Sequence, residues 1–286
     1  MLRSRIAPTP SGFLHEGNIA AFLYTWLLVQ KANGELLLRI DDLDNERFRE
    51  AYLNYIFEAL QAAGITFQTG PKDAHEFYTQ WSQQLRLSMY EKYLQQLWQT
   101  GQVYVCTCSR QQIAKHQCSC FQKKPAPDTP HAAWRLQVPH DTHIQWHDDA
   151  LGNVSFCLNE VQHAPIIKRS NGLPAYHIAS LADDVYFGIN CIVRGEDLLA
   201  STALQLYIAS LLQLDTFLQC RFIHHPLMMN KTGEKISKSA GNASLQLQPP
   251  FPDAQRCLKQ IVQWFPQQFD NNATANSATD LLNYML

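Results

Sequence analysis

Two stretches far apart in the chain carry residues that could hold a nucleotide. The first runs from Arg5 to Asn18 and contains Pro8, Pro10 and Gly12, which do not continue a regular strand, before an apolar segment with helical spacing. This pattern predicts a short strand that turns abruptly into a helix. A helix start offers unpaired N–H groups and a positive dipole end to a phosphate. Alone, a His-x-Gly-Asn turn is more often a simple beginning of a helix.

The second stretch, Lys235 to Ser239, places two lysines three residues apart, with serines between and after them. This composition suits a mobile loop that closes over a triphosphate and neutralises charge on the departing pyrophosphate. A single loop of this kind is usually solvated surface. The order of the two stretches and their separation are what favour a nucleotide site.

Four of the eight cysteines form a third chemical pattern, two C-x-C pairs separated by nine residues: Cys106, Cys108, Cys118 and Cys120. Four thiolates in two close pairs can complete a tetrahedral structural zinc site, with His116 as a substitute ligand. The competing interpretation is a loop of free thiols in a reducing compartment. A zinc ion here would order the segment around it.

Length and composition bound the class of protein. A chain of 286 residues can form one large domain with an insertion or two modest domains. Hydrophobic content of 46% and charged content of 17% fit a soluble globular protein, and no stretch has the roughly 18 to 20 apolar residues of a membrane span. With no signal peptide after Met1, a cytoplasmic location is expected. The net charge of −2 argues against a surface that coats nucleic acid, so any RNA contact must be local.

The elements that would position these residues alternate between strand and helix. Arg3 to Ala7 and Glu35 to Ile40 are predicted strands joined by a helix from Ile19 to Lys31, an order that implies a parallel sheet with the site at its strand ends. Helices are then predicted over 48–63 and 81–100. In the second of these, four apolar residues are predicted to face the core: Leu85, Met89, Tyr93 and Leu97.

From residue 102 the pattern changes to short β-like pieces, and the parallel pattern is predicted to resume at 166–169. A helix over 176–181, a strand over 190–193 and a helix over 198–212 would follow. The predicted fold class is α/β, a doubly wound, Rossmann-like parallel sheet split by a small zinc-bearing insertion domain. The predicted domains are 1–101 and 166–250 for the two halves of the nucleotide fold, 102–165 for the insertion, and 251–286 for a short helical segment and polar tail. Residues 267–279 are predicted to be a frayed end.

Five stretches together resemble the glutamyl-tRNA synthetases of the class I aminoacyl-tRNA synthetase family, and the likeness covers about residues 3 to 245. They are Arg5 to Gly12, Arg39 to Asp44, Leu173 to Tyr176, Val193 to Leu198 and Lys235 to Ser239. In overall length the chain is similar to the truncated branch of this family, the glutamyl-queuosine tRNA(Asp) synthetases. The resemblance implies a class I catalytic fold that activates glutamate with ATP and Mg²⁺, and a structural zinc.

The resemblance also implies a glutamate pocket. Two arginines suit the two carboxylates of glutamate, because a guanidinium recognises a carboxylate through two parallel hydrogen bonds. The tyrosine would donate its hydroxyl to the substrate. The aspartate stands where the family usually has a glutamate that holds the ammonium group, so either the substrate lies closer to the strand or a water bridges the gap. The pocket residues are Arg5, Ala7, Thr9, Asp41, Tyr176 and Arg194.

For ATP, the resemblance implies that residues of both signature stretches and the backbone near Met228 contact the nucleotide. The catalytic candidates, His15 and Lys238, would stabilise phosphate charge while the glutamate carboxylate attacks the α-phosphorus. Glu16 departs from the family pattern and is predicted to point away from the phosphates, because neighbouring residues at a helix start face different ways. The implied ATP-binding residues are His15, Gly17, Asn18, Met228, Lys235, Ser237 and Lys238.

The function expected from these features is activation of glutamate and its transfer to queuosine in the anticodon loop of tRNA(Asp) by a monomeric enzyme. Its partners would be glutamate, ATP and tRNA, with no membrane. Three alternatives stay open at this point. The chain could be a shortened glutamyl-tRNA synthetase that charges a tRNA 3′ end, a class I nucleotidyltransferase that makes a dinucleotide-like cofactor, or an inactive RNA-binding relative.

Overall fold

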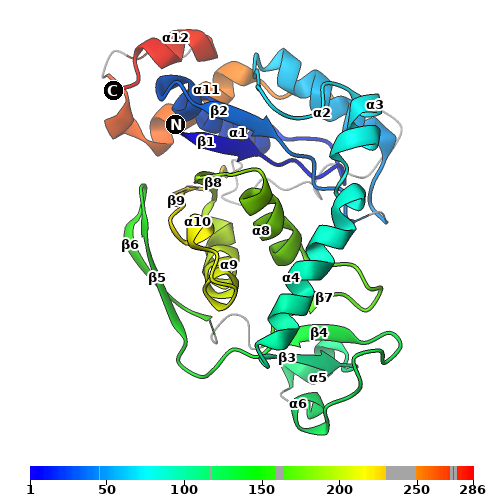
Figure 1. The fold of residues 1–286 in the computed structure, drawn as a ribbon. Coiled ribbons are helices and arrows are strands. Elements are labelled where there is room, and N and C mark those ends of the chain that lie inside the picture. The colour runs from blue at the N-terminus through cyan, green and yellow to red at the C-terminus, as the bar shows by residue number, and fades with distance from the viewer. Residues whose placement is uncertain (45, 116–117, 159–163, 230–248, 271–272, 274–275) are drawn as a thin grey trace. The chain divides into compact units, whose positions relative to one another are not determined.

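The structure, a computed structural model, describes residues 1–44, 46–115, 118–158, 164–229, 249–270, 273 and 276–286 (Figure 1). The chain divides into two compact units. The first contains Met1–Gln83, Ile189–Asp197 and Arg221–Leu286, and the second contains Gln84–Gly188 and Leu198–Cys220. Among the described residues, no helix is both long enough and apolar enough to cross a membrane.

A parallel sheet forms the centre of the first unit. Its strands are β1 (Arg3–Ile6), β2 (Glu35–Leu38), β8 (Cys191–Gly195) and β9 (Arg221–His225), in the order β2-β1-β8-β9. Each neighbouring pair runs parallel. The strands are short and largely buried, as expected for a parallel sheet that is covered on both faces. The α/β fold class predicted from the sequence is confirmed.

The connection from β1 to β2 is the long helix α1 (Glu16–Lys31). Its buried residues include Ile19, Leu23 and Leu27, none of which has exposed surface, because the helix packs on the sheet and also against α11 (Ala254–Trp264). Two helices follow β2: α2 (Glu50–Ala62) and the single turn α3 (Ala74–Glu76). This β-α-β unit directs the loop before α1 to the carboxyl ends of the strands.

The C-terminal part of the first unit packs against α1, contrary to the predicted frayed end. After α11, a 3₁₀ turn at Pro266–Gln268 leads to α12 (Ala278–Asn283), which also contacts α1 (Figure 1). The ring of Tyr24 stacks on Phe265 at 4.3 Å, and its hydroxyl donates to Oε1 of Gln268 at 2.9 Å. The ring stacking and the hydrogen bond hold the described part of a segment whose composition is mainly polar.

The single helix predicted over 81–100 is interrupted in the structure. A π-helical turn at Phe77–Trp81 ends at Ser82, whose backbone is extended, and a 3₁₀ turn at Gln83–Arg86 precedes α4 (Leu87–Gln99). The cause is Asp42, which accepts from the Ser82 hydroxyl at 2.5 Å and from the backbone N–H of Gln83 at 2.7 Å. A side chain that satisfies the backbone in this way caps a new helical start and ends the previous one.

The buried face of α4 differs from the predicted stripe. Leu97 is buried as expected, but Met89 and Tyr93 are only half-buried and Leu85 is 54% exposed. Leu85 lies in the 3₁₀ turn before the helix, so it does not continue the helical face. The fully buried positions are instead Tyr90, Leu94 and Leu97.

The second unit contains a small antiparallel sheet. Its strands are β3 (Val103–Cys106), β4 (Ala133–Leu136) and β7 (Ile166–Lys168), in the order β3-β4-β7. The prediction that 166–169 resumes the parallel sheet is therefore wrong: β7 is a strand, but it pairs antiparallel with β4. An extended segment of three residues does not reveal its pairing partner, because periodicity specifies only the local conformation.

Besides α4 and this sheet, the described residues of the second unit form a hairpin and five α-helices. The hairpin pairs β5 (His143–Asp148) with β6 (Gly152–Cys157). The helices are α5 (Arg110–Ala114), α6 (Cys120–Lys123), α8 (Tyr176–Tyr186), α9 (Leu199–Leu211) and α10 (Asp215–Leu218). Asp183 of α8 has no exposed surface and receives two hydrogen bonds from the Arg86 guanidinium, at 2.8 and 3.0 Å, and one from the Tyr90 hydroxyl at 2.8 Å. This buried ion pair fastens α8 to the start of α4.

Candidate active site

Two buried arginines stand on neighbouring strands of the first unit. Arg5 is on β1 and Arg194 is on β8, and each residue is 5% exposed to solvent. Arg5 donates from Nη1 to the carbonyl of Val193 at 3.3 Å, and the Arg194 guanidinium lies 5.6 Å from the centre of the Phe222 ring. Buried guanidinium groups are rare unless they meet an anion or a ring. Their location near the carboxyl ends of parallel strands is where α/β sheets bind ligands.

The loop after β1 carries the next two predicted pocket residues, Ala7 and Thr9, both half-buried. It is tied to the segment after β2 by backbone hydrogen bonds. Arg39 donates to the carbonyl of Ile6 at 3.0 Å, and Asp41 donates to that of Pro8 at 3.0 Å. Because these bonds alternate along an extended chain, Arg39 and Asp41 project on the same side.

Asp41 is buried and strongly held. The Arg39 guanidinium binds both carboxylate oxygens, with Nε to Oδ1 at 2.7 Å and Nη2 to Oδ2 at 3.1 Å. The side-chain nitrogen Nε2 of Gln83 donates to Oδ1 at 3.3 Å. A bidentate pair of this kind fixes the orientation of the carboxylate as well as its charge. The acidic side chain predicted to meet an ammonium group is therefore already oriented by the protein.

The first signature stretch ends at the start of α1. His15 is the N-cap residue, and Oδ1 of Asn18 accepts from the backbone N–H of His15 at 3.2 Å. A side chain at Gly17 would crowd His15: a Cβ there would lie 3.1 Å from Cε1 and 3.2 Å from Nδ1 of His15, and 3.6 Å from Cβ of Met228. The structure thus brings together three predicted ATP residues of the first stretch with Met228, which follows β9.

Glu16, the departure from the family pattern, turns toward α11. Its Oε1 accepts from Nη1 of Arg256 at 3.0 Å, and its backbone carbonyl accepts from the Cys257 thiol at 3.4 Å. The carboxylate sits in the first turn of α1, where it also interacts favourably with the helix dipole. The Glu16 carboxylate therefore has a protein partner, Arg256 of α11.

The structure gives less information about the other predicted site residues. Tyr176 is the first residue of α8 in the second unit, where its ring meets that of His177 edge-on at 5.4 Å. Lys235, Ser237 and Lys238 fall in 230–248, which lies outside the described residues.

The four predicted metal ligands converge in the second unit, on β3, on α6 and in the segments that flank them. Their sulfur atoms all lie within 4.8 Å of one another, with Cys106 and Cys118 3.7 Å apart and Cys108 and Cys120 3.5 Å apart. A tetrahedral zinc site with Zn–S bonds of about 2.3 Å requires S···S separations of about 3.8 Å. The donor set and its spacing therefore fit a metal ion.

The closely spaced thiols shift one another's pKa in opposite directions. Burial would raise the pKa of Cys120, but hydrogen bonds from the backbone at Thr107 and from Cys108 outweigh it and lower that pKa to about 7. Burial and bonds from neighbouring thiols raise the pKa of Cys108 to about 12. Tyr104, packed edge-on against Phe121 at 5.6 Å, has its pKa raised to about 12 by burial and by the nearby Cys118 and Cys106. Its phenol stays protonated, so it is a poor competitor for a metal.

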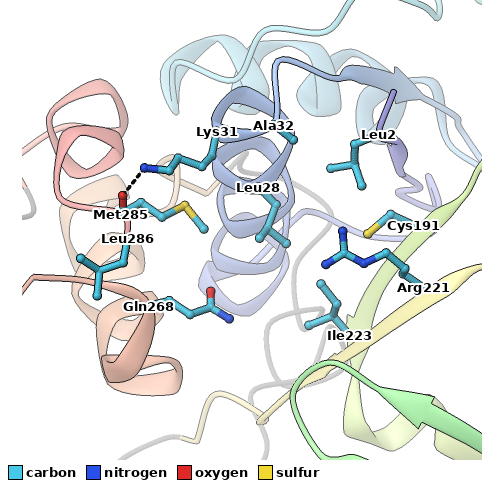
Figure 2. Close-up of a pocket in the computed structure, with 10 residues that line it drawn as sticks. All are labelled: Leu2, Leu28, Lys31, Ala32, Cys191, Arg221, Ile223, Gln268, Met285 and Leu286. Carbon is cyan, nitrogen blue, oxygen red and sulfur yellow. Dashed lines mark hydrogen bonds between the residues drawn. The ribbon is translucent and has the colours of Figure 1, made fainter.

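A cavity of about 240 Å³ lies elsewhere in the first unit (Figure 2). It is lined partly by Leu2, Cys191 and Arg221, which lie at the amino ends of β1, β8 and β9. Lys31 borders it and donates to the carbonyl of Met285. Nucleotides bind beyond the carboxyl ends of parallel strands, so this cavity is not the candidate active site.

Sequence reasoning assigned no role to three residues that shape the site: Arg39, Gln83 and Arg256. Arg39 could have been found, because residues two apart in an extended segment share a face and Asp41 was already a candidate. Gln83 is 42 residues from Asp41 and Arg256 is 240 residues from Glu16, and neither belongs to a motif. No local signal connects those pairs.

The fold and the buried residues at its strand ends define a class of protein. Residues 1–248 match the family described as tRNA synthetases class I (E and Q), catalytic domain, and the chain belongs to this family. A solved glutamate-tRNA synthetase structure from Elizabethkingia anophelis superimposes with a TM-score of 0.78 at 21% identity, over 100% of this chain and 66% of that one, which shows the shared fold.

Two curated relatives show which members of this family the chain is similar to. The chain is 34% identical over 261 residues to a glutamyl-Q tRNA(Asp) synthetase from Pseudomonas putida, covering 91% of this chain and 83% of that protein. It is 31% identical over 266 residues to the glutamate–tRNA ligase of Finegoldia magna, covering 83% of this chain and 53% of that protein. The chain thus spans about half the length of the glutamate–tRNA ligases it matches. The resemblance inferred from the motifs is confirmed.

Proposed function

We propose that this protein activates glutamate with ATP and transfers it to queuosine in the anticodon loop of tRNA(Asp). The observation that carries the proposal is the pair of buried arginines, Arg5 and Arg194, on neighbouring strands whose carboxyl ends also carry the His15–Gly17 turn. The glutamyl-Q tRNA(Asp) synthetase similarity supports the choice of acceptor.

In the activation step, a glutamate carboxylate oxygen attacks the α-phosphorus of ATP, the α–β phosphoanhydride bond breaks, and pyrophosphate leaves. Arg5 and Arg194 hold the two carboxylates of glutamate, and Asp41 accepts from its ammonium group. Ala7 and Thr9 line the pocket, and Tyr176 donates its hydroxyl to the substrate. The protein contributes alignment and charge stabilisation, without a side-chain nucleophile.

The nucleotide is held by both signature stretches. His15 and Lys238 stabilise the charge that develops on the phosphates, Lys235, Ser237, Gly17 and Asn18 contact the triphosphate, and the backbone at Met228 holds adenine. Mg²⁺ accompanies ATP, as phosphate-bound Mg²⁺ commonly does. In the second step, a hydroxyl of the queuosine ring attacks the glutamyl carbonyl, and AMP leaves.

Residues 102–165, together with β7, which pairs with β4, serve as the insertion that contacts the RNA, and in the sequence they lie between the two halves of the nucleotide fold; the described part of 251–286 packs against α1. The four-cysteine cluster binds structural zinc and orders this insertion, because thiolates in tetrahedral spacing are preferred zinc ligands. An RNA loop is a suitable acceptor, because it presents splayed bases and hydroxyls to a compact domain.

Two measurements test the proposal in sequence. The first is exchange of labelled pyrophosphate into ATP, which we expect with glutamate and without tRNA; equal exchange with aspartate or glutamine would refute the substrate. In the second, the protein is incubated with ATP, labelled glutamate and tRNA(Asp) with or without queuosine, and the RNA is digested to nucleosides for mass spectrometry. We expect label on the queuosine nucleoside alone.

A second candidate, a glutamyl-tRNA synthetase that charges a tRNA 3′ end, is favoured by the 31% identity to glutamate–tRNA ligases. It predicts label on the 3′-terminal adenosine of tRNA(Glu), independent of queuosine. The nucleoside digest separates the two candidates directly.

Replacing Gly17 by alanine should impair the nucleotide site without weakening the fold. The added methyl would meet the His15 imidazole at 3.1 Å, so the ring would have to shift by a few tenths of an ångström. Alanine is a better helix former than glycine, so the melting temperature should stay the same or rise. We expect the kcat/KM for ATP in glutamate-dependent exchange to fall about tenfold, the equivalent of one displaced charge-stabilising contact. Unchanged exchange would show that the position of His15 is not important.

A further inference from the structure

The side chain of Gln83 meets Asp41 from a segment that carries none of the signature motifs. Its Nε2 donates to Oδ1 of Asp41 at 3.3 Å, and the residue is 2% exposed. An ionised carboxylate only accepts hydrogen bonds, so the amide must present its NH₂ group to Asp41 and cannot be reversed. The contact is therefore a directed one between two buried groups.

The backbone around Gln83 is fixed independently of this amide. Asp42 accepts from the backbone N–H of Gln83 at 2.7 Å and from the hydroxyl of Ser82 at 2.5 Å. These bonds interrupt the helix at this point, and they place Gln83 in the following 3₁₀ turn. The two consecutive acidic residues thus have different roles. Asp42 fixes the backbone at Ser82 and Gln83, and this places the Gln83 side-chain amide within hydrogen-bonding distance of Asp41.

Asp41 is consequently held from two directions. Arg39, from the same strand end, binds both carboxylate oxygens, and Gln83 binds Oδ1 from the segment that Asp42 anchors. Arg39 alone leaves the carboxylate able to tilt about the axis of the bidentate pair. A second donor at one oxygen removes that freedom, and ligands lose affinity when a recognition group is not preorganised.

We propose that Gln83 is a positioning residue for amino-acid recognition, which orients the Asp41 carboxylate toward the ammonium group of the substrate. This inference rests on the proposed function, in which Asp41 receives that ammonium. It also explains how the shorter aspartate can bind the ammonium group. Asp41 has one fewer rotatable bond than glutamate, and Gln83 and Arg39 fix its remaining side-chain rotations.

The test uses Gln83→Met, which keeps the shape and length of the side chain and the backbone bond to Asp42 but removes the donor. We expect the KM for glutamate in pyrophosphate exchange to rise about tenfold, as for the loss of one hydrogen bond to a charged group, while kcat and the KM for ATP change less than twofold. Gln83→Glu, which sets a second carboxylate against Asp41, should raise the KM for glutamate further. Gln61→Met, an exposed position on α2, is the matched control and should leave all three constants unchanged.

A KM for glutamate unchanged in Gln83→Met would overturn the inference, as would an equal rise in the KM for ATP, which indicates a general structural effect. If Gln83→Met does not fold, Gln83→Asn gives the same comparison, because its amide nitrogen stops one methylene short of Asp41. Absence of glutamate-dependent exchange by the unaltered protein would instead refute the proposed function. The two failures are therefore distinguishable.

Discussion

Replacing Arg194 by alanine is expected to lower the kcat/KM for glutamate by roughly 100-fold, mostly through the KM. The Arg194 guanidinium on β8 is buried over the ring of Phe222 on β9, and in the proposed complex it pairs with a substrate carboxylate. Truncating one partner of a buried charge pair costs about 3 kcal/mol, because the other charge is left desolvated, and each 1.4 kcal/mol corresponds to tenfold. Pyrophosphate exchange at varied glutamate concentration measures the effect.

Two variants make the result interpretable. Arg194→Lys keeps the charge but loses the planar fork, so it should recover only part of the loss. Arg221→Ala removes an exposed arginine at the amino end of the neighbouring strand β9 and should leave the KM for glutamate unchanged. A rise in the KM for ATP, with glutamate affinity intact, would show that Arg194 serves the nucleotide and not the amino acid.

The parts of the fold that could be predicted are those encoded locally. The β1-α1-β2 unit follows from proline and glycine punctuation and from a helical run, and all three elements begin within three residues of the expected positions. The cysteine cluster could be predicted for the same reason. Each C-x-C pair lies within three residues, and the loop between the pairs is short enough to bring them together.

The parts that could not be predicted depend on partners distant in the chain. The break at Ser82 is caused by Asp42, 40 residues earlier, and no helical pattern records it. The C-terminal segment has a polar composition, yet Leu281 is fully buried. Phe269 also forms an antiparallel β-bridge with Met285. A few apolar residues, widely spaced, are enough to dock it on α1. Composition averages over these residues and therefore indicated a frayed end.

The same distinction applies to the site. Motifs identified the groups that would contact substrate, because such groups recur at fixed spacing. They gave no role to Arg39, although it lies in one of the motif stretches, and they did not include Gln83; both residues contact Asp41, and their contribution is orientation. Many arrangements can orient a carboxylate, so no fixed spacing marks the residues that do so. A sequence therefore indicates what could be bound more readily than how rigidly the binding groups are held.

Replacing one cysteine of the cluster should weaken metal binding and loosen the second unit more than the first. We expect protein purified without added metal to contain about one zinc ion per chain, by elemental analysis. Cys108→Ser should reduce zinc affinity by more than about 100-fold in a chelator competition, since a structural zinc site loses a quarter of its ligands and metal binding is coupled to folding. Limited proteolysis should then cut within 106–124, where α5 and α6 are short helices with little core of their own.

The effect on activity should be unequal between the two steps. Apart from Tyr176, the described residues proposed for activation, among them Arg5, Asp41 and Arg194, belong to the first compact unit, and the cysteines belong to the second. Glutamate-dependent pyrophosphate exchange by Cys108→Ser should therefore stay within a few-fold of the unaltered protein, while transfer to RNA falls at least tenfold. Cys157→Ser, which removes a half-buried thiol from β6 outside the cluster, is the matched control and should retain zinc and both steps. A folded, fully active protein without zinc would contradict the metal assignment, because the four closely spaced thiols would then have some other role.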